Sequence, residues 1–353
     1  MNFELTPQQK AVQQSARQFA QTVLQETVLE DDAAGCFPEE AYKKMGEMGF
    51  VGLPFPKEYG GQGGDYLSYV LALEEISKIN SSVGIAYSVC TSLYSGALIN
   101  DGNEEKKKKY LPEVLSGKKM GSFCLTEPDA GSDAAGCKTT AIWNGKEYIL
   151  NGLKCFITNG GIASFYCITA MTDKTKGVKG ISMFLVDAGT PGLSTGNEEN
   201  KMGIRTSNTC DVVLEDCRIP AANLVGEEGR GFSIAMKTLD QARAWMGCVA
   251  TGIAQRGINE GIAYAKERVQ FGKPVIKNQA MQFKVADMEI KTETARQMVA
   301  HALTKMDMGL PHSKEAAIAK CYASDIAMEV ASEAIQMFGG YGYSREYPVE
   351  KLL

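Results

Sequence analysis

The sequence FCLTEPDAGSD, residues Phe123–Asp133, decides how this chain is organised. It begins as an apolar strand, breaks at Pro128 and continues into small polar residues. Gly131 can adopt a positive φ, so successive backbone N–H groups near it can converge on an anion. The sequence CFITNGG, residues Cys155–Gly161, interrupts a second apolar strand in the same way. The two strand ends can form the walls of one flat pocket, or they can be two unrelated hairpin loops.

The composition is that of a globular protein with a sizeable core. A chain of 353 residues with 44% apolar and 22% charged residues has room for two or three domains. The net charge is −5, and the densest positive run, Lys106–Lys109, follows two glutamates and reads as a solvated helix face. No basic stripe occurs, so we expect no nucleic-acid partner.

The sequence also bears on compartment and on metals. We expect no membrane span, because no apolar run approaches the roughly 18 residues that a span needs. The N-terminus shows no targeting pattern, which indicates a cytoplasmic protein, or a mitochondrial matrix protein after removal of a leader. The ten cysteines are scattered and form no CxxC, so we expect no metal site and interpret them as reduced core residues.

Hydrophobic periodicity predicts an α+β fold with three domains. Residues 1–120 have a helical period and start at Thr6, an N-cap followed by proline. Residues 121–227 contain short strands, including a hairpin at Asn144-Gly145, and predict an antiparallel β-barrel or sandwich. Residues 228–353 predict a helical bundle, incomplete as a four-helix bundle because only three long helices fit. These three helices are about Phe232–Glu267, Asn278–Met308 and Ser313–Gly339.

Several reaction types lack their residues in this sequence. With two histidines, His301 in a predicted helix and His312 in a loop, a Ser-His-Asp or Cys-His hydrolase is disfavoured. No GxSxG, GxxxxGK[ST] or GxGxxG motif occurs, which argues against α/β-hydrolase, P-loop and dinucleotide-binding folds. If the chain is an enzyme, an organic cofactor should therefore carry the reaction.

Four motifs in order resemble the acyl-CoA dehydrogenase family, most closely its short-chain, butyryl-CoA type. They are LTEPDAGSD at 125–133, FITNG at 156–160, RVQFGK at 268–273 and QMFGGYG at 336–342. The resemblance covers the whole chain and implies FAD bound between the β domain and the helical bundle of a homotetramer. It implies α,β-dehydrogenation of a short-chain acyl-CoA, or the reverse enoyl-CoA reduction. A hydride would pass to flavin N5, and the electrons to an electron-transfer flavoprotein.

The resemblance also assigns the flavin contacts, residue by residue. The backbone of Phe123 and Leu125 and the hydroxyl of Thr126 would bond the pyrimidine edge of the flavin, where such donors steady developing negative charge. Phe156 would lie against the ring system, and the Thr158 hydroxyl near N5. A further hydroxyl, that of Ser132, would reach phosphate oxygens of a bound nucleotide, from the cofactor or the substrate.

A second set of residues would complete the site from the helical region. Arg268 of a partner chain would bind the FAD pyrophosphate, because a guanidinium forks onto two oxygens. The other expected cofactor contacts in this set are Phe271, Gln279, Gln336, Gly339 and Gly340. For the substrate, Asp240 would hold the pantetheine or adenine part of acyl-CoA and Arg243 would sit near the thioester.

The catalytic base is where the sequence departs from the family pattern. The family's usual glutamate would lie beyond Leu353, and Ala242 occupies the alternative position, so we name no base. We expect that the chain is a truncated form of a longer enzyme, with weak FAD binding and negligible turnover as it stands. The alternatives are a non-catalytic FAD- or acyl-CoA-binding subunit, or a base-less relative such as a desulfinase or an oxidase.

Overall fold

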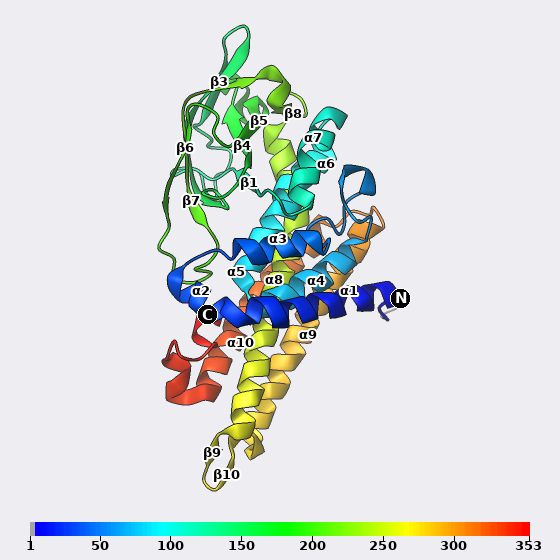
Figure 1. Cartoon of the computed structure of the whole chain (residues 1–353), viewed down its shortest axis with the longest axis vertical. Coiled ribbons are helices and arrows are strands. Elements are labelled where there is room, and N and C mark those ends of the chain that lie inside the picture. The colour runs from blue at the N-terminus through cyan, green and yellow to red at the C-terminus, as the bar shows by residue number, and fades with distance from the viewer. Residues whose placement is uncertain (1–3) are drawn as a thin grey trace.

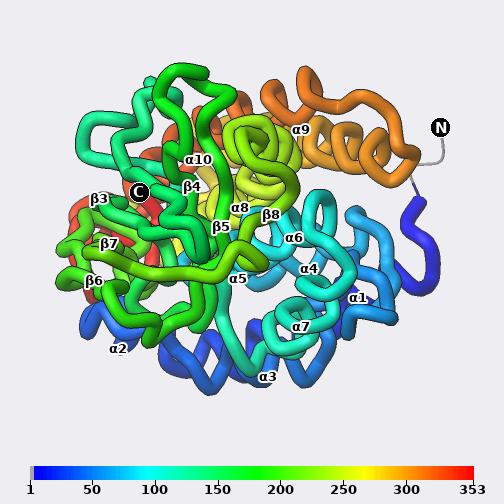
Figure 2. The backbone as a smooth tube through the Cα atoms, turned by 90° about the horizontal axis from the view of Figure 1, so that it is seen from above, coloured from blue at the N-terminus to red at the C-terminus, as the bar shows by residue number. Residues whose placement is uncertain are grey.

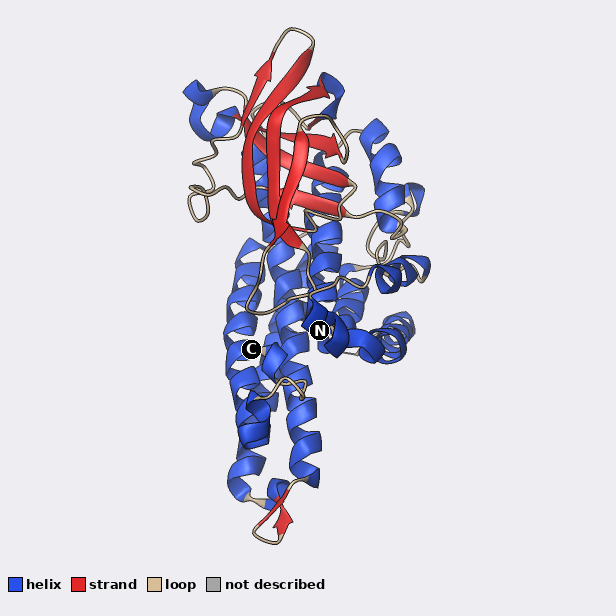
Figure 3. Cartoon of the chain, turned by 60° about the vertical axis from the view of Figure 1, so that its left-hand side comes forward, coloured by secondary structure: helices blue, strands red, loops and turns tan. Residues whose placement is uncertain are grey.

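The computed structural model describes residues 4–353 and places a β-sheet at one end of an assembly of helices. In Figure 1 the sheet lies at the upper left and the long helices descend from it to a small hairpin, β9 (Val269–Gln270) and β10 (Lys273–Pro274), at the bottom. Figure 3 shows the same separation of strands from the lower helices. The predicted sequence of helices, strands and helices is confirmed.

The first part of the chain is helical, as predicted, and local signals set its boundaries. Thr6 and Gln9 form a capping box at the start of the first helix, with Pro7 at its first position. Asp65, Asn80 and Asn103 cap later helices through their side chains. The α-helices are α1 (Pro7–Phe19), α2 (Gln25–Ala34), α3 (Glu39–Glu47), α4 (Tyr66–Ile79), α5 (Ser81–Ser88), α6 (Gly96–Asp101) and α7 (Glu104–Leu115).

Two π-helical segments interrupt this region, η1 (Ala20–Leu24) and η3 (Val89–Ser95). The continuous helix Ser81–Asp101 that contains η3 is long and apolar enough to match a membrane span, contrary to the expectation that no apolar run approaches that length. However, 83% of its most apolar window is buried inside the protein, which is the pattern of a central core helix. In Figure 2, α5 and α6 lie at the centre of the molecule.

The middle region forms one eight-stranded sheet with the order β6-β7-β3-β2-β4-β5-β8, and β1 also pairs with β4. Most pairings are antiparallel, as expected, but β1 and β2 each pair with β4 in parallel. The Asn144-Gly145 hairpin joins β2 and β3 as predicted. The strands are β1 (Gly121–Cys124), β2 (Thr140–Trp143), β3 (Glu147–Thr158), β4 (Phe165–Met171), β5 (Ile181–Asp187), β6 (Leu193–Glu198), β7 (Thr209–Pro220) and β8 (Leu224–Val225).

Three long helices make up the last part of the chain, close to their predicted limits. They are α8 (Gly231–Glu267), α9 (Gln279–Asp307) and α10 (Ser313–Phe338), with Gly339 at φ 61° directly after α10. Helix α8 packs on α9, α10 and also on α4, so the first and last helical regions share one apolar core. All ten cysteines are free thiols, and eight are buried as expected, but Cys36 and Cys321 are exposed and do not belong to the core.

Candidate functional site

The structure brings the two polar strand ends side by side. The Ser122 hydroxyl donates to the Thr158 carbonyl at 2.8 Å, and the Cys155 N–H donates to the Thr126 carbonyl at 3.0 Å. The Asn159 amide donates to the Gly121 carbonyl at 3.2 Å. The segments 121–126 and 155–159 therefore run antiparallel to each other and form one surface from two motifs.

Phe156 lies on this surface in an unusual backbone conformation. The pairing of β3 with β7 shifts register between Lys154 and Ile157, which is a β-bulge. Within the bulge, Phe156 has φ 55° and its side chain is 65% exposed. A positive φ is strained for an aromatic residue, and strain of this kind gathers at ligand sites. The bulge therefore holds an uncovered aromatic ring beside the two strand ends.

Two threonine hydroxyls on the same surface have no hydrogen-bond partner. Thr126 and Thr158 are half-buried, and in the described part of the chain neither hydroxyl takes part in a hydrogen bond. Phe123 is buried in β1, Leu125 is half-buried, and Ser132 is exposed in the loop that follows. An aromatic ring with two unpaired hydroxyls suits a flat heteroaromatic ligand, so the residues fit a flavin by shape and donor chemistry.

Behind this surface lies a buried ion pair that the sequence reasoning missed. The Lys154 ammonium is fully buried and lies 2.7 Å from Oε1 of Glu127, a side chain that is 4% exposed. Burial raises the pKa of Glu127, but the charge and hydrogen bonds of Lys154 and the neighbouring N–H groups outweigh it and lower this pKa from 4.5 to about 2. The available signal was strand phase, since Lys154 shares the inward phase of Tyr148 and Leu150.

Asn159 is a second residue that the sequence reasoning missed. Its side chain is fully buried, and its amide nitrogen also donates to the Ala86 carbonyl at 3.2 Å. With φ 63°, Asn159 turns the chain at the end of β3, a conformation that asparagine tolerates better than most residues. It thereby fixes the end of β3 to β1 and to the central helix α5.

The second predicted set gathers around another pocket, of about 480 Å³, near the far ends of α8 and α10. Arg268, Gln336, Gly339 and Gly340 line it together with an aromatic cluster. The Arg268 guanidinium lies 5.7 Å from the ring centroid of Tyr341, a cation–π distance. A guanidinium, a glycine pair and aromatic rings can hold a nucleotide's phosphates and base.

Two members of this set lie apart from the pocket lining. Phe271 is at the tip of the β9–β10 hairpin with φ 51°, and its side chain is 96% exposed. Gln279 begins α9 and is exposed. An uncovered phenylalanine at a hairpin tip is suited to contact with another molecule, because it gains burial only there.

The two sets are separated along the molecule. Cys90 of η3 contacts Gly121 of β1, and Thr91 bonds the Tyr69 hydroxyl at 2.5 Å. The Tyr69 ring in turn packs on Trp245 of α8, with ring centroids 4.3 Å apart. From Trp245 to Arg268 the helix spans roughly 35 Å at about 1.5 Å per residue. That length exceeds the distance from the flavin ring to the pyrophosphate within one FAD molecule.

The predicted substrate residues form a small polar group on α8. Asp240 accepts a hydrogen bond from the Ser313 hydroxyl at 2.8 Å and also forms an ion pair with Arg243. Both side chains are partly exposed, so the charge of Arg243 is paired at the protein surface. Ala242 is 5% exposed and carries no ionisable group.

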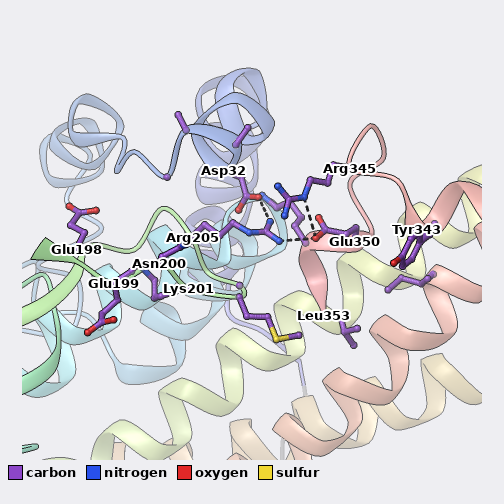
Figure 4. A pocket seen from close by; sticks show the side chains of 18 residues that line it. Asp32, Glu198, Glu199, Asn200, Lys201, Arg205, Tyr343, Arg345, Glu350 and Leu353 are labelled. Atoms are coloured by element: carbon purple, nitrogen blue, oxygen red, sulfur yellow. Dashed lines mark hydrogen bonds and ion pairs between the residues drawn. The ribbon is translucent and has the colours of Figure 1, made fainter. Parts of the chain in front are cut away.

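A larger cavity, of about 810 Å³, lies elsewhere, and none of the predicted cofactor or substrate residues lines it. It is drawn in Figure 4, where Arg205 bridges Asp32 and Glu350 at 2.6 and 2.7 Å. The Glu350 carboxylate is thus held in an ion pair, and it also lies 3.9 Å from Arg345. This cavity joins three distant segments of the chain.

Family models match nearly the whole chain. The N-terminal domain of acyl-CoA dehydrogenases matches residues 6–118, the middle domain residues 122–217 and the C-terminal domain residues 229–353. The chain belongs to the acyl-CoA dehydrogenase family, as the four motifs predicted.

In the part of the chain that the structure describes, no group of three His, Cys, Asp or Glu side chains could hold a metal ion.

Individual members of the family are similar to this chain over its whole length. The chain is 46% identical over 353 residues to the short-chain specific acyl-CoA dehydrogenase of Clostridium acetobutylicum, covering 100% of this chain and 93% of the relative. Butyryl-CoA dehydrogenase from Megasphaera elsdenii has a TM-score of 0.98 at 46% identity, with the same coverage. A structure from a study of the electron transferring flavoprotein of Acidaminococcus fermentans and flavin-based electron bifurcation has a TM-score of 0.99 at 48% identity, again with that coverage.

Proposed function

We propose that this protein is a FAD-dependent acyl-CoA dehydrogenase for short-chain acyl-CoA, working with an electron-transfer flavoprotein. The observation that carries the proposal is the surface formed by segments 121–126 and 155–159, which holds the exposed ring of Phe156 and two unpaired threonine hydroxyls. Family membership and relatives named as short-chain or butyryl-CoA dehydrogenases support the reaction class. When bound, FAD accepts the substrate's β-hydrogen as a hydride.

In this proposal each residue has a stated task. Thr126 donates to the pyrimidine edge of the flavin, Thr158 positions the edge that carries N5, and Phe156 covers one face of the ring. Donors fixed in this way stabilise negative charge that develops on the ring without reorganising. Asp240 and Arg243 orient the acyl-CoA from α8. No residue of the chain is proposed as the base that removes the α-proton.

We further propose that each FAD is held by two copies of the chain within a homotetramer. Arg268, Phe271, Gln279 and Gln336 with its neighbouring glycines would serve the flavin bound to another copy. The length of α8 from Trp245 to Arg268, roughly 35 Å, supports this, as does the 96% exposure of Phe271. An active site shared across a symmetric interface is a common outcome of closed oligomers. A CoA-ester enzyme of this type would work in a bacterial cytoplasm or a mitochondrial matrix.

The proposal is tested by anaerobic titration of the full-length, FAD-loaded protein with butyryl-CoA while the visible flavin absorbance is recorded. We expect the absorbance to bleach, and to return when electron-transfer flavoprotein is added. Crotonyl-CoA added to the reduced protein tests the reverse direction. Failure of every saturated acyl-CoA to bleach the flavin would refute dehydrogenation and favour a non-catalytic binding subunit, or a relative with another reaction.

A further inference from the structure

The buried ion pair of Lys154 and Glu127 touches the predicted flavin surface from behind. Lys154 comes from β3, one residue before the bulge, while Glu127 comes two residues after Leu125 in the other motif. Besides Glu127, the Lys154 ammonium donates to the Leu125 carbonyl at 3.2 Å and to the Thr169 hydroxyl at 3.1 Å. All three ammonium hydrogens therefore have an oxygen acceptor in the protein interior.

The Glu127 carboxylate is satisfied in the same complete way. It accepts the Lys138 N–H at 2.7 Å and the Thr139 N–H at 3.2 Å, in addition to Lys154. One carboxylate thus ties the chain entering β2 to the middle of the first motif. A buried pair is retained cheaply only if its remaining hydrogen-bonding groups are satisfied, and here they are.

This arrangement fixes the direction of one peptide unit. A trans peptide is planar, and its C=O and N–H point in opposite directions. Because Lys154 holds the Leu125 carbonyl toward the interior, the Thr126 N–H of the same peptide unit points the other way, out of the interior. Among residues 4–353 no backbone or side-chain acceptor is bonded to that N–H. The next carbonyl, that of Thr126, is held by the Cys155 N–H.

We propose that Lys154 and Glu127 are positioning residues for the cofactor. Together they aim the Thr126 N–H as a hydrogen-bond donor at the pyrimidine edge of the flavin. The inference rests on the proposed function, and it adds a residue pair that does not touch the cofactor. The pair sets the direction of the donor, while its own charges cancel and leave the site neutral behind the ring.

The test uses the double variant Lys154→Met/Glu127→Gln, which removes both charges and keeps similar side-chain volumes, so that no unpaired buried charge remains. We expect a folded protein whose FAD dissociation constant rises by about tenfold, the effect of losing one aligned hydrogen bond. The visible spectrum of bound FAD should shift, and its reduction potential should become more negative. A merely structural pair would change thermal stability and leave these flavin properties unaltered.

The matched control is Lys78→Met, which breaks a largely buried lysine pair with Glu74 and Glu75 in the helical region. It should alter stability without altering the spectrum or potential of FAD. A folded double variant with the parent's FAD affinity, spectrum and potential would overturn the inference alone. Absence of FAD binding by the parent protein would overturn the proposed function together with it.

A second measurement needs no variant and covers the case in which the double variant fails to fold. Amide hydrogen exchange of the peptide containing Thr126 is compared in the parent protein with and without FAD. We expect the Thr126 amide to exchange rapidly in the free protein and at least about tenfold more slowly with FAD, because exchange follows the loss of a hydrogen bond. Equal exchange rates in the two states would overturn the inference.

Discussion

The Ser122 hydroxyl donates to the Thr158 carbonyl at 2.8 Å, so one side chain in β1 holds the end of β3 in place. This bond connects the strand that leads into the first motif with the second motif, and the two bonded residues are 36 positions apart in the sequence. Ser122 is fully buried in its strand, and Thr158 carries one of the two unpaired hydroxyls of the proposed flavin surface. The relation links strand packing directly to the geometry of the site.

The variant Ser122→Ala should leave the Thr158 carbonyl without its donor. We expect the free energy of unfolding to fall by about 1–2 kcal/mol, the usual cost of an unsatisfied buried acceptor, and FAD binding to weaken. Urea denaturation and quenching of FAD fluorescence measure the two effects. Ser332→Ala, on the exposed side of α10, is the control and should change neither; unchanged FAD affinity in Ser122→Ala would show that this bond does not shape the site.

The strained backbone of Phe156 predicts that replacing this residue by glycine raises stability while it weakens cofactor binding. Because glycine adopts φ 55° without strain, Phe156→Gly should stabilise the protein by about 1 kcal/mol relative to Phe156→Leu, which keeps the strained Cβ. Both variants should bind FAD more weakly, since both lose the ring. Thermal unfolding of the cofactor-free proteins gives the stabilities. A glycine variant less stable than the leucine variant would contradict the assignment of strain to this residue.

The lowered pKa of Glu127 predicts that its contribution to the free energy of unfolding decreases at acid pH. Its pKa is lowered to about 2 in the folded protein, so its contribution is present above about pH 4.5 and is lost as the pH falls toward 2. The contribution is at most about 3 kcal/mol. The difference in unfolding free energy between the parent and Glu127→Gln should therefore shrink as the pH falls from 5 toward 3, measured by urea denaturation.

The exposed pair of Glu40 and Lys43 supplies the control for this experiment. Glu40→Gln should cause no measurable change in stability at either pH, because solvent screens an exposed pair. A difference between the parent and Glu127→Gln that stays constant over this pH range would show that the Glu127 charge does not stabilise the fold.

Replacing Asp240 should weaken substrate binding and leave cofactor binding unchanged. Its carboxylate is bonded by the Ser313 hydroxyl and paired with Arg243, so Asp240→Asn releases the arginine from its position. We expect the dissociation constant of butyryl-CoA to rise by about tenfold, with an unchanged FAD dissociation constant. Separate titrations with butyryl-CoA and with FAD measure the two constants. Lys237→Gln on the same helix should leave butyryl-CoA binding unchanged; a tenfold loss of FAD affinity in Asp240→Asn would place the residue at the cofactor.

Much of the fold was predictable because its signals are local. The capping box at Thr6, the Asn144-Gly145 hairpin and the glycine after α10 each involve a few neighbouring residues. The parallel pairing of β1 with β4 was not predictable in this way, because strand order depends on contacts between distant segments. Strand β6 was missed because its residues are mostly polar and exposed.

The candidate site, too, was predictable where its signals are local and not where distant segments meet. The residues of the site were named from four motifs, and the structure adds how they meet. Lys154 and Glu127 are 27 residues apart, and each alone reads as an ordinary surface charge. The bulge at Phe156 depends on pairing with β7, which only the assembled sheet supplies. The separation of Arg268 from the flavin surface could not be predicted from the motifs, because it depends on the length and direction of α8.

The central claim, one FAD site built from two copies of the chain, is tested most directly by mixing two defective variants. Phe156→Ala damages the flavin surface and Arg268→Gln the distal set, so neither alone should retain FAD. In mixed oligomers, a pair of unlike chains has one site with both defects and one with none. Co-expressed variants should then recover about one quarter of the parent's FAD content, as random mixing makes half of the pairs unlike. FAD content no higher than that of the separate variants would contradict the claim.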